Sequence, residues 1–329
     1  MRVIAIGGSN TLLDGGYVSQ ISTFLPQADI LNRAIGDTNS TMGLYRLMTF
    51  DDLRPGDIIV WEYALNDGFG VKARGDEWHL RNLEYTIRFC AEKGCHILPV
   101  ILATQVSNEA RIPTPYVAKI HFLCAAYGID VIDILPEVRY HLNLPKIPAS
   151  DYRDESHYRP NGQMVKFVGA RIADAIYRGL RRPRLVPPIY VRQGCGIFIR
   201  TDFDGPPKRR FHNSILDFEY QDLRDGGFVF APQIVGGIIL SCINMSSPNA
   251  GTCHIDINGK AFPLGMGNRF SFDKKPLLRA HFGWGPAKDI SAEKGSVVRF
   301  SPADLVENDG GQARGIVAMV VEAPDNLNA

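Results

Sequence analysis

The chain has 329 residues, of which 45% are hydrophobic and 22% are charged. It is therefore long enough for about two domains and apolar enough to bury a core, which excludes a disordered, collagenous or coiled-coil protein. Its 36 Lys and Arg residues balance 35 Asp and Glu residues to a formal net charge of +1, without a long run of either sign. This charge pattern gives no indication of a nucleic acid or an anionic membrane as a partner.

The start of the chain is interpreted as a buried strand. Segment 1–6 is too short for the apolar part of a signal peptide, and it runs directly into Gly7-Gly8-Ser9-Asn10. In addition, no stretch of the chain approaches the roughly 18 apolar residues of a membrane-spanning helix. We therefore expect a cytoplasmic protein.

Short apolar runs alternate with amphipathic segments over the first half of the chain. The runs expected to form strands are rich in β-branched residues and bounded by Gly, Pro or Asp: 3–6, 29–31, 57–63, 96–102 and 129–134. The segments expected to form helices are 17–25, 42–50, 78–93, 115–127 and 161–180. This alternation predicts a parallel sheet covered on both faces, with ligand chemistry at the carboxyl ends of its strands.

The pattern changes after residue 184. Segment 185–188 (Leu-Val-Pro-Pro) is interpreted as a linker, and beyond it the helical period disappears. Short strands are expected instead, separated by turn signals such as Asp225-Gly226-Gly227: 189–191, 196–200, 214–220, 237–243, 253–257, 297–300 and 315–322. We predict an α/β domain over residues 1–184 and an all-β, jelly-roll-like sandwich over residues 185–329.

Two segments of the first domain carry candidate acid–base chemistry. Ser9 follows the first expected strand between small residues, where a nucleophile would be exposed, although such a turn is more often only a turn. Asp154 and His157 are three residues apart, so the carboxylate can bond Nδ1 of the imidazole and leave Nε2 free as a base. The alternative is a capping Asp and a surface His. The pair lacks a third ligand in a fitting spacing, so we expect no metal.

Further polar groups follow the second and third strands. The amide of Gly36, the side-chain amide of Asn66 and the amide of Ser9 could converge on one point. Three neutral donors at one point are what a developing tetrahedral oxyanion needs. Taken separately, Gly36 and Asn66 are more simply turn residues.

Taken together, these residues resemble the four sequence blocks of the SGNH (GDSL-type) hydrolase superfamily. The blocks would be Gly7–Asn10, Gly36–Thr38, Ala64–Asp67 and Asp154–His157, within residues 1 to 182. The resemblance implies a flavodoxin-like α/β/α fold, with Ser9 as nucleophile, His157 as base and acid, and Asp154 as its orienting partner. It also implies that Ser9, Gly36 and Asn66 form the oxyanion hole.

The chain departs from the family pattern at three positions. Gly8 stands where Asp is common, Asn10 stands where Leu is frequent, and Ala64 replaces the usual Gly. The methyl group of Ala64 is expected to narrow the acyl pocket without removing the Asn66 donor.

The resemblance implies a serine ester hydrolase for small acyl esters, with acetyl groups on a carbohydrate as the expected substrate and no metal or cofactor. The first alternative is an O-acyltransferase that passes an acyl group, for example from acetyl-CoA, to a sugar. The second is a non-catalytic glycan-binding module. An oligomer is compatible with the sequence.

Other side chains have a functional and a structural interpretation. Arg33, which stands between the first two blocks, could meet a polar or anionic group of the substrate, with exposure to solvent as an equal alternative. Asn10, at the end of the first block, is also expected to meet substrate. Trp61, Tyr63 and Trp78 could line a cleft, but a core position is favoured. In the second domain, Trp284 and the segment Phe228–Phe230 could form a sugar-stacking platform, against the favoured interpretation of a sandwich core.

Overall fold

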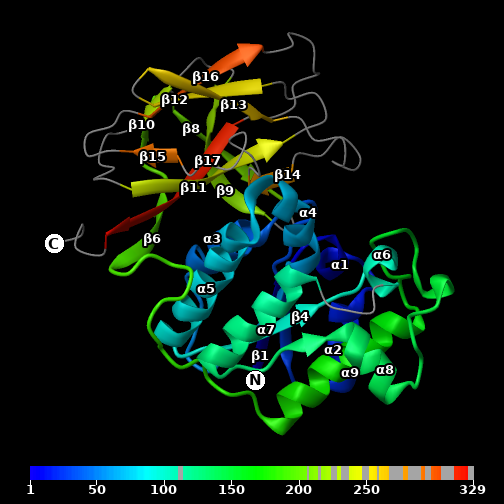
Figure 1. Ribbon diagram of the computed structural model, residues 1–329. Helices are drawn as coiled ribbons and strands as arrows, with labels where there is room; N and C mark the ends of the chain where they lie inside the picture. The colour runs from blue at the N-terminus through cyan, green and yellow to red at the C-terminus, as the bar shows by residue number, and fades with distance from the viewer. Residues whose placement is uncertain are drawn as a thin grey trace. The chain divides into compact units, whose positions relative to one another are not determined.

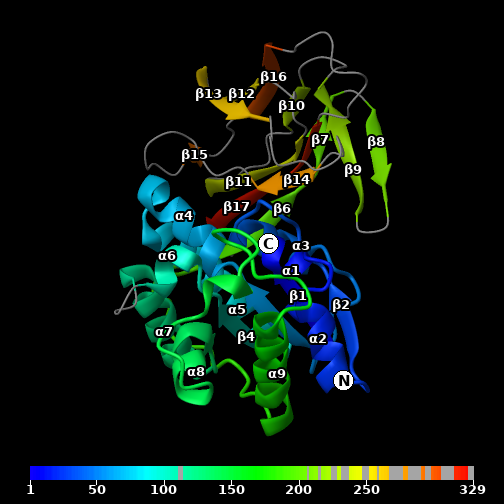
Figure 2. The same ribbon diagram turned by 90° about the vertical axis from the view of Figure 1, so that its right-hand side faces the viewer.

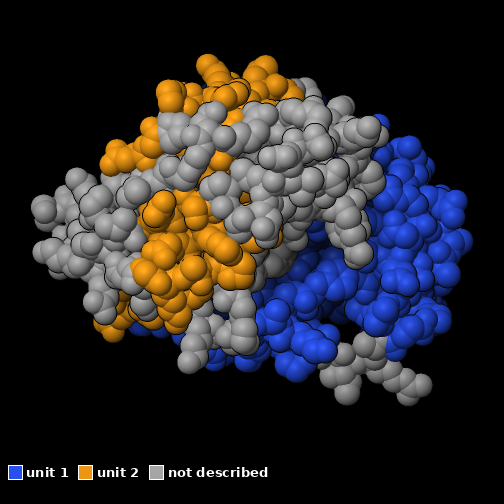
Figure 3. Space-filling model, turned by 90° about the horizontal axis from the view of Figure 1, so that it is seen from above, with its two compact units in different colours: residues 1–191 blue, residues 192–329 orange. Residues whose placement is uncertain are grey.

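The computed structural model divides into two compact units, Met1–Val191 and Arg192–Ala329, which Figure 3 shows in blue and orange. The residues that it describes are 1–109, 114–205, 207–213, 216–223, 228–230, 237–246, 252–257, 259–266, 277–280, 290–292, 298–304 and 315–324. Within these residues, no helix combines the length and the apolar character needed to cross a membrane.

Unit 1 extends seven residues beyond the predicted boundary at residue 184 because a buried carboxylate holds the segment that follows. Glu84 is fully buried, and its carboxylate accepts the backbone N–H groups of Ile189, Tyr190 and Val191. The Tyr127 hydroxyl donates to the same carboxylate at 2.6 Å. The expected strand over 189–191 is therefore wrong, since its donors bond a side chain instead of a neighbouring strand.

Unit 1 is built on a parallel sheet whose described strands have the order β2-β1-β3-β4-β5. These strands are β1 (Arg2–Gly7), β2 (Asp29–Asn32), β3 (Ile58–Glu62), β4 (His96–Ile101) and β5 (Ile132–Asp133). The order is the flavodoxin-like one, which confirms the predicted fold class. β5 begins at Ile132, later than expected, and it ends at Asp133, whose side chain caps the following helix by accepting from the Leu135 N–H.

The helices of unit 1 cover both faces of this sheet, as the two ribbon views show (Figures 1 and 2). They are α1 (Ser9–Leu12), α2 (Tyr17–Phe24), α3 (Ser40–Met48), α4 (Ala64–Arg74), α5 (Asp76–Glu92), α6 (Gln105–Asn108), α7 (Pro115–Tyr127), α8 (Ile134–His141) and α9 (Gln163–Arg178). The helices α1, α4, α6 and α8 were not expected from the sequence. They begin where strands end, at the edge that carries the candidate residues.

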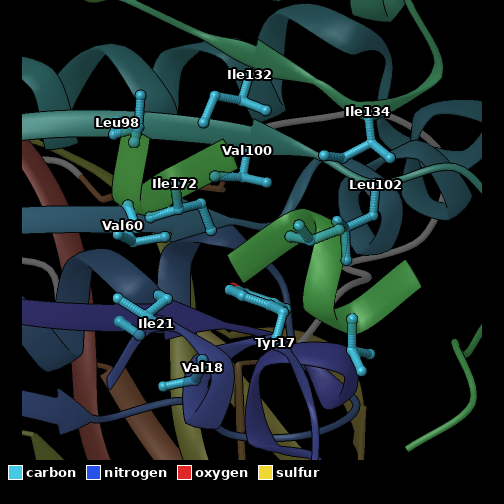
Figure 4. Close-up of a cluster of buried hydrophobic side chains, with 14 of the residues drawn as sticks. Tyr17, Val18, Ile21, Val60, Leu98, Val100, Leu102, Ile132, Ile134 and Ile172 are labelled. Atoms are coloured by element: carbon cyan, nitrogen blue, oxygen red, sulfur yellow. The ribbon is translucent and has the colours of Figure 1, made fainter. Parts of the chain in front are cut away.

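Two buried clusters separate the three layers. On one face, side chains of α2, α8 and α9 pack on alternate strand residues, and Figure 4 shows Tyr17, Ile21, Val60, Val100 and Ile172 in this cluster. On the other face, α3, α5 and α7 pack on the intervening strand residues. Period-2 alternation along each strand thus supplies both cores.

The described strands of unit 2 form two antiparallel sheets. One has the order β13-β12-β16-β10-β7, and the other has the order β14-β11-β17-β9-β8, with β15 on β11 and β6 on β17. Ile255 and Phe300 of the first sheet share a buried cluster with Cys242 and Met319 of the second. This packing is that of a two-sheet sandwich, as predicted.

The strands of unit 2 are bounded as follows: β6 (Cys195–Arg200), β7 (Phe203–Asp204), β8 (Lys208–His212), β9 (Asp217–Asp222), β10 (Phe228–Phe230), β11 (Gly237–Ser246), β12 (Thr252–Ile257), β13 (Lys260–Gly265), β14 (Leu277–Ala280), β15 (Ile290–Ala292), β16 (Val298–Asp304) and β17 (Gly315–Pro324).

Candidate active site

A chain of hydrogen bonds joins a serine, a histidine and an aspartate at the carboxyl edge of the parallel sheet. Ser9 is the first residue of α1, directly after β1. Its hydroxyl lies 2.6 Å from Nε2 of His157, and Nδ1 of the same ring lies 2.7 Å from Oδ1 of Asp154. This is the geometry in which an imidazole can take the proton of a hydroxyl while a carboxylate orients the ring.

The turn that presents Ser9 needs a residue without a side chain at position 8. The Gly8 backbone is extended, with φ −85°, and its N–H donates to the Glu62 carbonyl at 3.2 Å. A Cβ built on Gly8 would lie 2.3 Å from Oδ1 of Asn66. A side chain at position 8 would therefore displace Asn66, so Gly8 leaves the space that the Asn66 amide occupies.

Asp154 organises the segment that carries His157. Its Oδ1 accepts from the Ser156 N–H at 3.0 Å, the His157 N–H at 2.9 Å and the His157 ring at 2.7 Å. Burial acts to raise the pKa of Asp154, but these hydrogen bonds and the nearby imidazole outweigh it and lower that pKa to about 2. The carboxylate is thus ionised at neutral pH and available to orient the ring.

Two tyrosines fix both ends of this segment to the end of β4. Tyr152 and Tyr158 pair across the base of the loop, with ring centroids 5.2 Å apart. The Tyr152 hydroxyl donates to the Ala103 carbonyl, and the Ala103 N–H donates to the Tyr158 hydroxyl, each at 3.0 Å. The Gln105 N–H also bonds the Glu155 carbonyl at 2.9 Å. The loop is therefore held from the β4 side.

The three expected oxyanion donors lie around Ser9. A Cβ built on Gly36 would lie 3.8 Å from the Ser9 Cβ, so the Gly36 backbone borders the nucleophile directly. The Asn66 side-chain amide lies against Gly8, the residue that precedes Ser9. Within the described residues, no hydrogen bond takes up the N–H of Ser9 or Gly36. Both amides are therefore available to a ligand.

A buried carboxyl group lies beneath the nucleophile. Oε2 of Glu62, at the end of β3, accepts from the Thr11 hydroxyl at 2.9 Å, and that hydroxyl also lies 2.8 Å from the Tyr17 hydroxyl. Glu62 is 1% exposed, and this burial raises its pKa to about 8 despite the Thr11 and Gly8 hydrogen bonds. Thr11 lies on α1, two residues after Ser9. Its hydrogen bond to Glu62 therefore connects α1 to the end of β3.

Two expected substrate-binding residues have other contacts. Asn10 is 5% exposed, and its side chain bonds the Ser156 carbonyl at 2.9 Å and the Tyr158 N–H at 3.2 Å. Its amide is therefore occupied by the chain itself, contrary to the expectation. The Arg33 guanidinium lies over the Phe50 ring at 4.2 Å, and a role for Arg33 toward substrate stays a prediction.

The aromatic candidates of unit 1 are core residues. Trp61 and Tyr63 are fully buried, with rings in an edge-to-face arrangement 5.8 Å apart, and Trp78 is 4% exposed. Ala64 belongs to the same buried cluster as Trp61 and Tyr63. Trp284 lies outside the described residues, as do the side chains of Phe228–Phe230.

Tyr152, Tyr158 and Glu62 escaped the sequence reasoning. The two tyrosines lie on either side of the Asp154–His157 block, and this placement was the available signal. Glu62 was marked only by being a carboxylate at the end of an apolar strand. In the described part of the chain, no group of three His, Cys, Asp or Glu side chains is placed to hold a metal ion.

Comparisons with known proteins show the fold. No family model and no curated protein matches the chain. A two-domain esterase active on acetylated mannans matches at TM-score 0.61 and 15% identity, over 97% of this chain and 90% of that one. The same esterase co-crystallised with mannopentaose matches at TM-score 0.59 with the same identity and coverage. An acetyl xylan esterase matches at TM-score 0.46 and 18% identity, over 54% of this chain and all of that one. The likeness to the two-domain esterase shows the fold of this chain, an α/β unit followed by a second, β-rich unit.

Proposed function

We propose that this protein is a serine ester hydrolase that removes acetyl or other small acyl groups from a carbohydrate. The observation that carries the proposal is the continuous path from Ser9 through His157 to Asp154, at 2.6 Å and 2.7 Å. A serine hydroxyl is a weak nucleophile at neutral pH, and a histidine oriented by a carboxylate is the usual means of activating it.

In the proposed reaction, Oγ of Ser9 attacks the ester carbonyl while Nε2 of His157 takes the hydroxyl proton. The negative charge that develops on the carbonyl oxygen is stabilised by the N–H groups of Ser9 and Gly36 and by the Asn66 side chain. His157 then gives its proton to the departing alcohol, which leaves an acyl-enzyme on Ser9. A water molecule activated by His157 releases the acid, so the reaction requires no metal or cofactor.

The carbohydrate part of the proposal rests on the comparison. Solved structures that resemble nearly the whole chain include those of an esterase active on acetylated mannans, one of them co-crystallised with mannopentaose. The likeness includes the second unit. We therefore propose an acetylated polysaccharide or oligosaccharide as the substrate class.

The test is the hydrolysis of an acetyl-ester reporter and of acetylated mannan by the wild type and by Ser9→Ala. Removal of the nucleophile is expected to lower turnover by roughly 10⁶-fold, to the background of the remaining groups. Thermal unfolding of both proteins controls for folding. Equal turnover by the two proteins would contradict the proposal.

A second assay separates hydrolysis from acyl transfer. An acyl-enzyme on Ser9 can react with water or with a sugar hydroxyl. With acetyl-CoA and an oligosaccharide present, a hydrolase is expected to release free acetate. Accumulation of acetylated oligosaccharide would instead establish the O-acyltransferase alternative.

A further inference from the structure

Asn10 connects the nucleophile to the loop of the catalytic histidine. It follows Ser9 on α1, and its side chain reaches 146 to 148 residues along the chain. Nδ2 donates to the Ser156 carbonyl at 2.9 Å, and Oδ1 accepts from the Tyr158 N–H at 3.2 Å. The two bonds hold the peptide groups immediately before and after His157.

The other supports of this loop come from a different direction. The bonds of Asp154 to Ser156 and His157 lie inside the loop, so they orient the ring relative to its own backbone. Tyr152, Tyr158 and Gln105 connect the loop to the end of β4. Among the described residues, the connections from the loop to α1 are the Ser9–His157 contact and the two bonds of Asn10.

Burial makes these two bonds effective. Asn10 is 5% exposed, so water does not compete freely for its amide, and a partner left without it would be buried and unsatisfied. Since Ser9 and Asn10 are adjacent, one residue pair fixes both the hydroxyl and the backbone that carries the imidazole.

We propose that Asn10 is a positioning residue, which sets the distance and the angle between the Ser9 hydroxyl and the His157 ring by holding both peptide groups that flank His157. The proposal rests on the proposed function, in which these two side chains exchange a proton. A misplacement of about 1 Å between reacting groups can lower a rate by roughly a hundredfold.

Asn108 offers a matched control. It is also 5% exposed, and its amide also bonds one carbonyl and one N–H of the backbone, both of Ile147, at 2.7 Å and 2.8 Å. Asn10→Leu and Asn108→Leu each replace a buried amide by an apolar side chain of similar size. Both variants are therefore expected to lose a similar amount of thermal stability.

The kinetic effect is expected to differ between them. On an acetyl-ester reporter, Asn10→Leu should lower kcat by roughly a hundredfold with little change in KM, because the side chain does not face substrate. Asn108→Leu should keep a kcat close to that of the wild type. Equal kcat losses in the two variants would overturn the proposal, as would a raised KM with unchanged kcat for Asn10→Leu.

A second variant keeps the test decisive if Asn10→Leu does not fold. Asn10→Asp preserves shape and still accepts from the Tyr158 N–H, but it can donate to the Ser156 carbonyl only when the introduced carboxyl is protonated. Its kcat is therefore expected to reach a maximum at lower pH than that of the wild type, whereas Asn108→Asp should not shift the maximum. An unshifted maximum for Asn10→Asp would overturn the proposal.

A spectroscopic measurement separates this proposal from the proposed function. The proton between Nδ1 of His157 and Asp154 should give a downfield NMR signal, identified by its loss in His157→Gln. Asn10→Leu should shift this signal or speed its exchange with water, and Asn108→Leu should not. If the wild type hydrolyses no ester, the proposed function fails, while this spectrum still decides the role of Asn10. Identical signals in the wild type and Asn10→Leu would overturn the proposal that Asn10 positions His157.

Discussion

The described residues of unit 1 include three histidine–aspartate pairs, of which His121–Asp133 is one, and the other two lie in contrasting surroundings. His157 and Asp154 lie in the loop at the sheet edge, with side chains 23% and 45% exposed and a contact of 2.7 Å. His79 of α5 and Asp67 of α4 are both fully buried, with a contact of 3.2 Å. Oδ1 of Asp67 already accepts from the Ser40 N–H, and Oδ2 accepts from the Tyr116 hydroxyl.

The difference lies mainly on the far side of each ring. Nε2 of His157 faces the Ser9 hydroxyl, whereas within the described residues neither ring nitrogen of His79 has a hydrogen-bond partner of good geometry. Trp78 packs edge-to-face on His79, with centroids 4.9 Å apart. The proposed reaction also needs a hydroxyl at the second ring nitrogen, which His157 has and His79 lacks among the described residues.

The largest effect that tests this comparison is expected from the two histidines. His157→Gln removes the base and should lower kcat/KM on an acetyl-ester reporter by roughly 10⁴-fold or more. His79→Gln should retain turnover and lower the free energy of unfolding by about 1–3 kcal/mol, because the ring fills a buried site. Kinetics and thermal unfolding measure the two effects. A comparable loss of turnover in folded His79→Gln would break the comparison.

The two aspartates should differ in the same sense. Asp154→Asn weakens the acceptor that fixes the ring tautomer and should lower kcat by roughly 10³-fold, whereas Asp67→Asn should act mainly on stability. The folded-state pKa of Asp154, about 2, lies below the usual value of about 3.9. Its contribution to stability is thus present above about pH 4 and is lost as the pH falls through 2. The melting temperatures of the wild type and of Asp154→Asn should therefore converge as the pH falls toward 2. A difference in melting temperature that stays constant with pH would contradict this.

Glu62 sharpens the comparison because it is buried like Asp67 but bonds Thr11 of α1, the helix that begins with Ser9. Its folded-state pKa of about 8 exceeds the unfolded value of about 4.3, so its ionisation in the unfolded chain lowers stability progressively between these pH values. The melting temperature of Glu62→Gln, measured relative to that of the wild type, should therefore rise as the pH increases from 5 to 8. Turnover should be nearly unchanged near pH 6. A pH-independent difference in melting temperature would contradict the assignment.

Local patterns in the sequence predicted the parts of the site that depend on local geometry. The Asp154–His157 pair was predictable because its partners are three residues apart. Ser9, Gly36 and Asn66 were placed at one edge because parallel strands end together. Their catalytic roles stay predictions, as do the cytoplasmic location and the jelly-roll strand order.

The contacts that escaped prediction join distant residues of the chain. Nothing near Asn10 indicates that its amide meets the peptides of Ser156 and Tyr158. Equally, the pairing of Asp67 with His79 depends on how α4 packs against α5. Such partners are chosen by tertiary packing, which a single sequence does not show.

The attachment of residues 189–191 to Glu84 has a practical consequence for anyone who trims the protein to its α/β half. A chain that stops at residue 184 loses the three main-chain donors of the enclosed Glu84 carboxylate. Of its partners among the described residues, the Tyr127 hydroxyl then remains, with the solvent that the carboxylate can recruit. Termination after Val191 preserves all three, and is where an excised fragment should end.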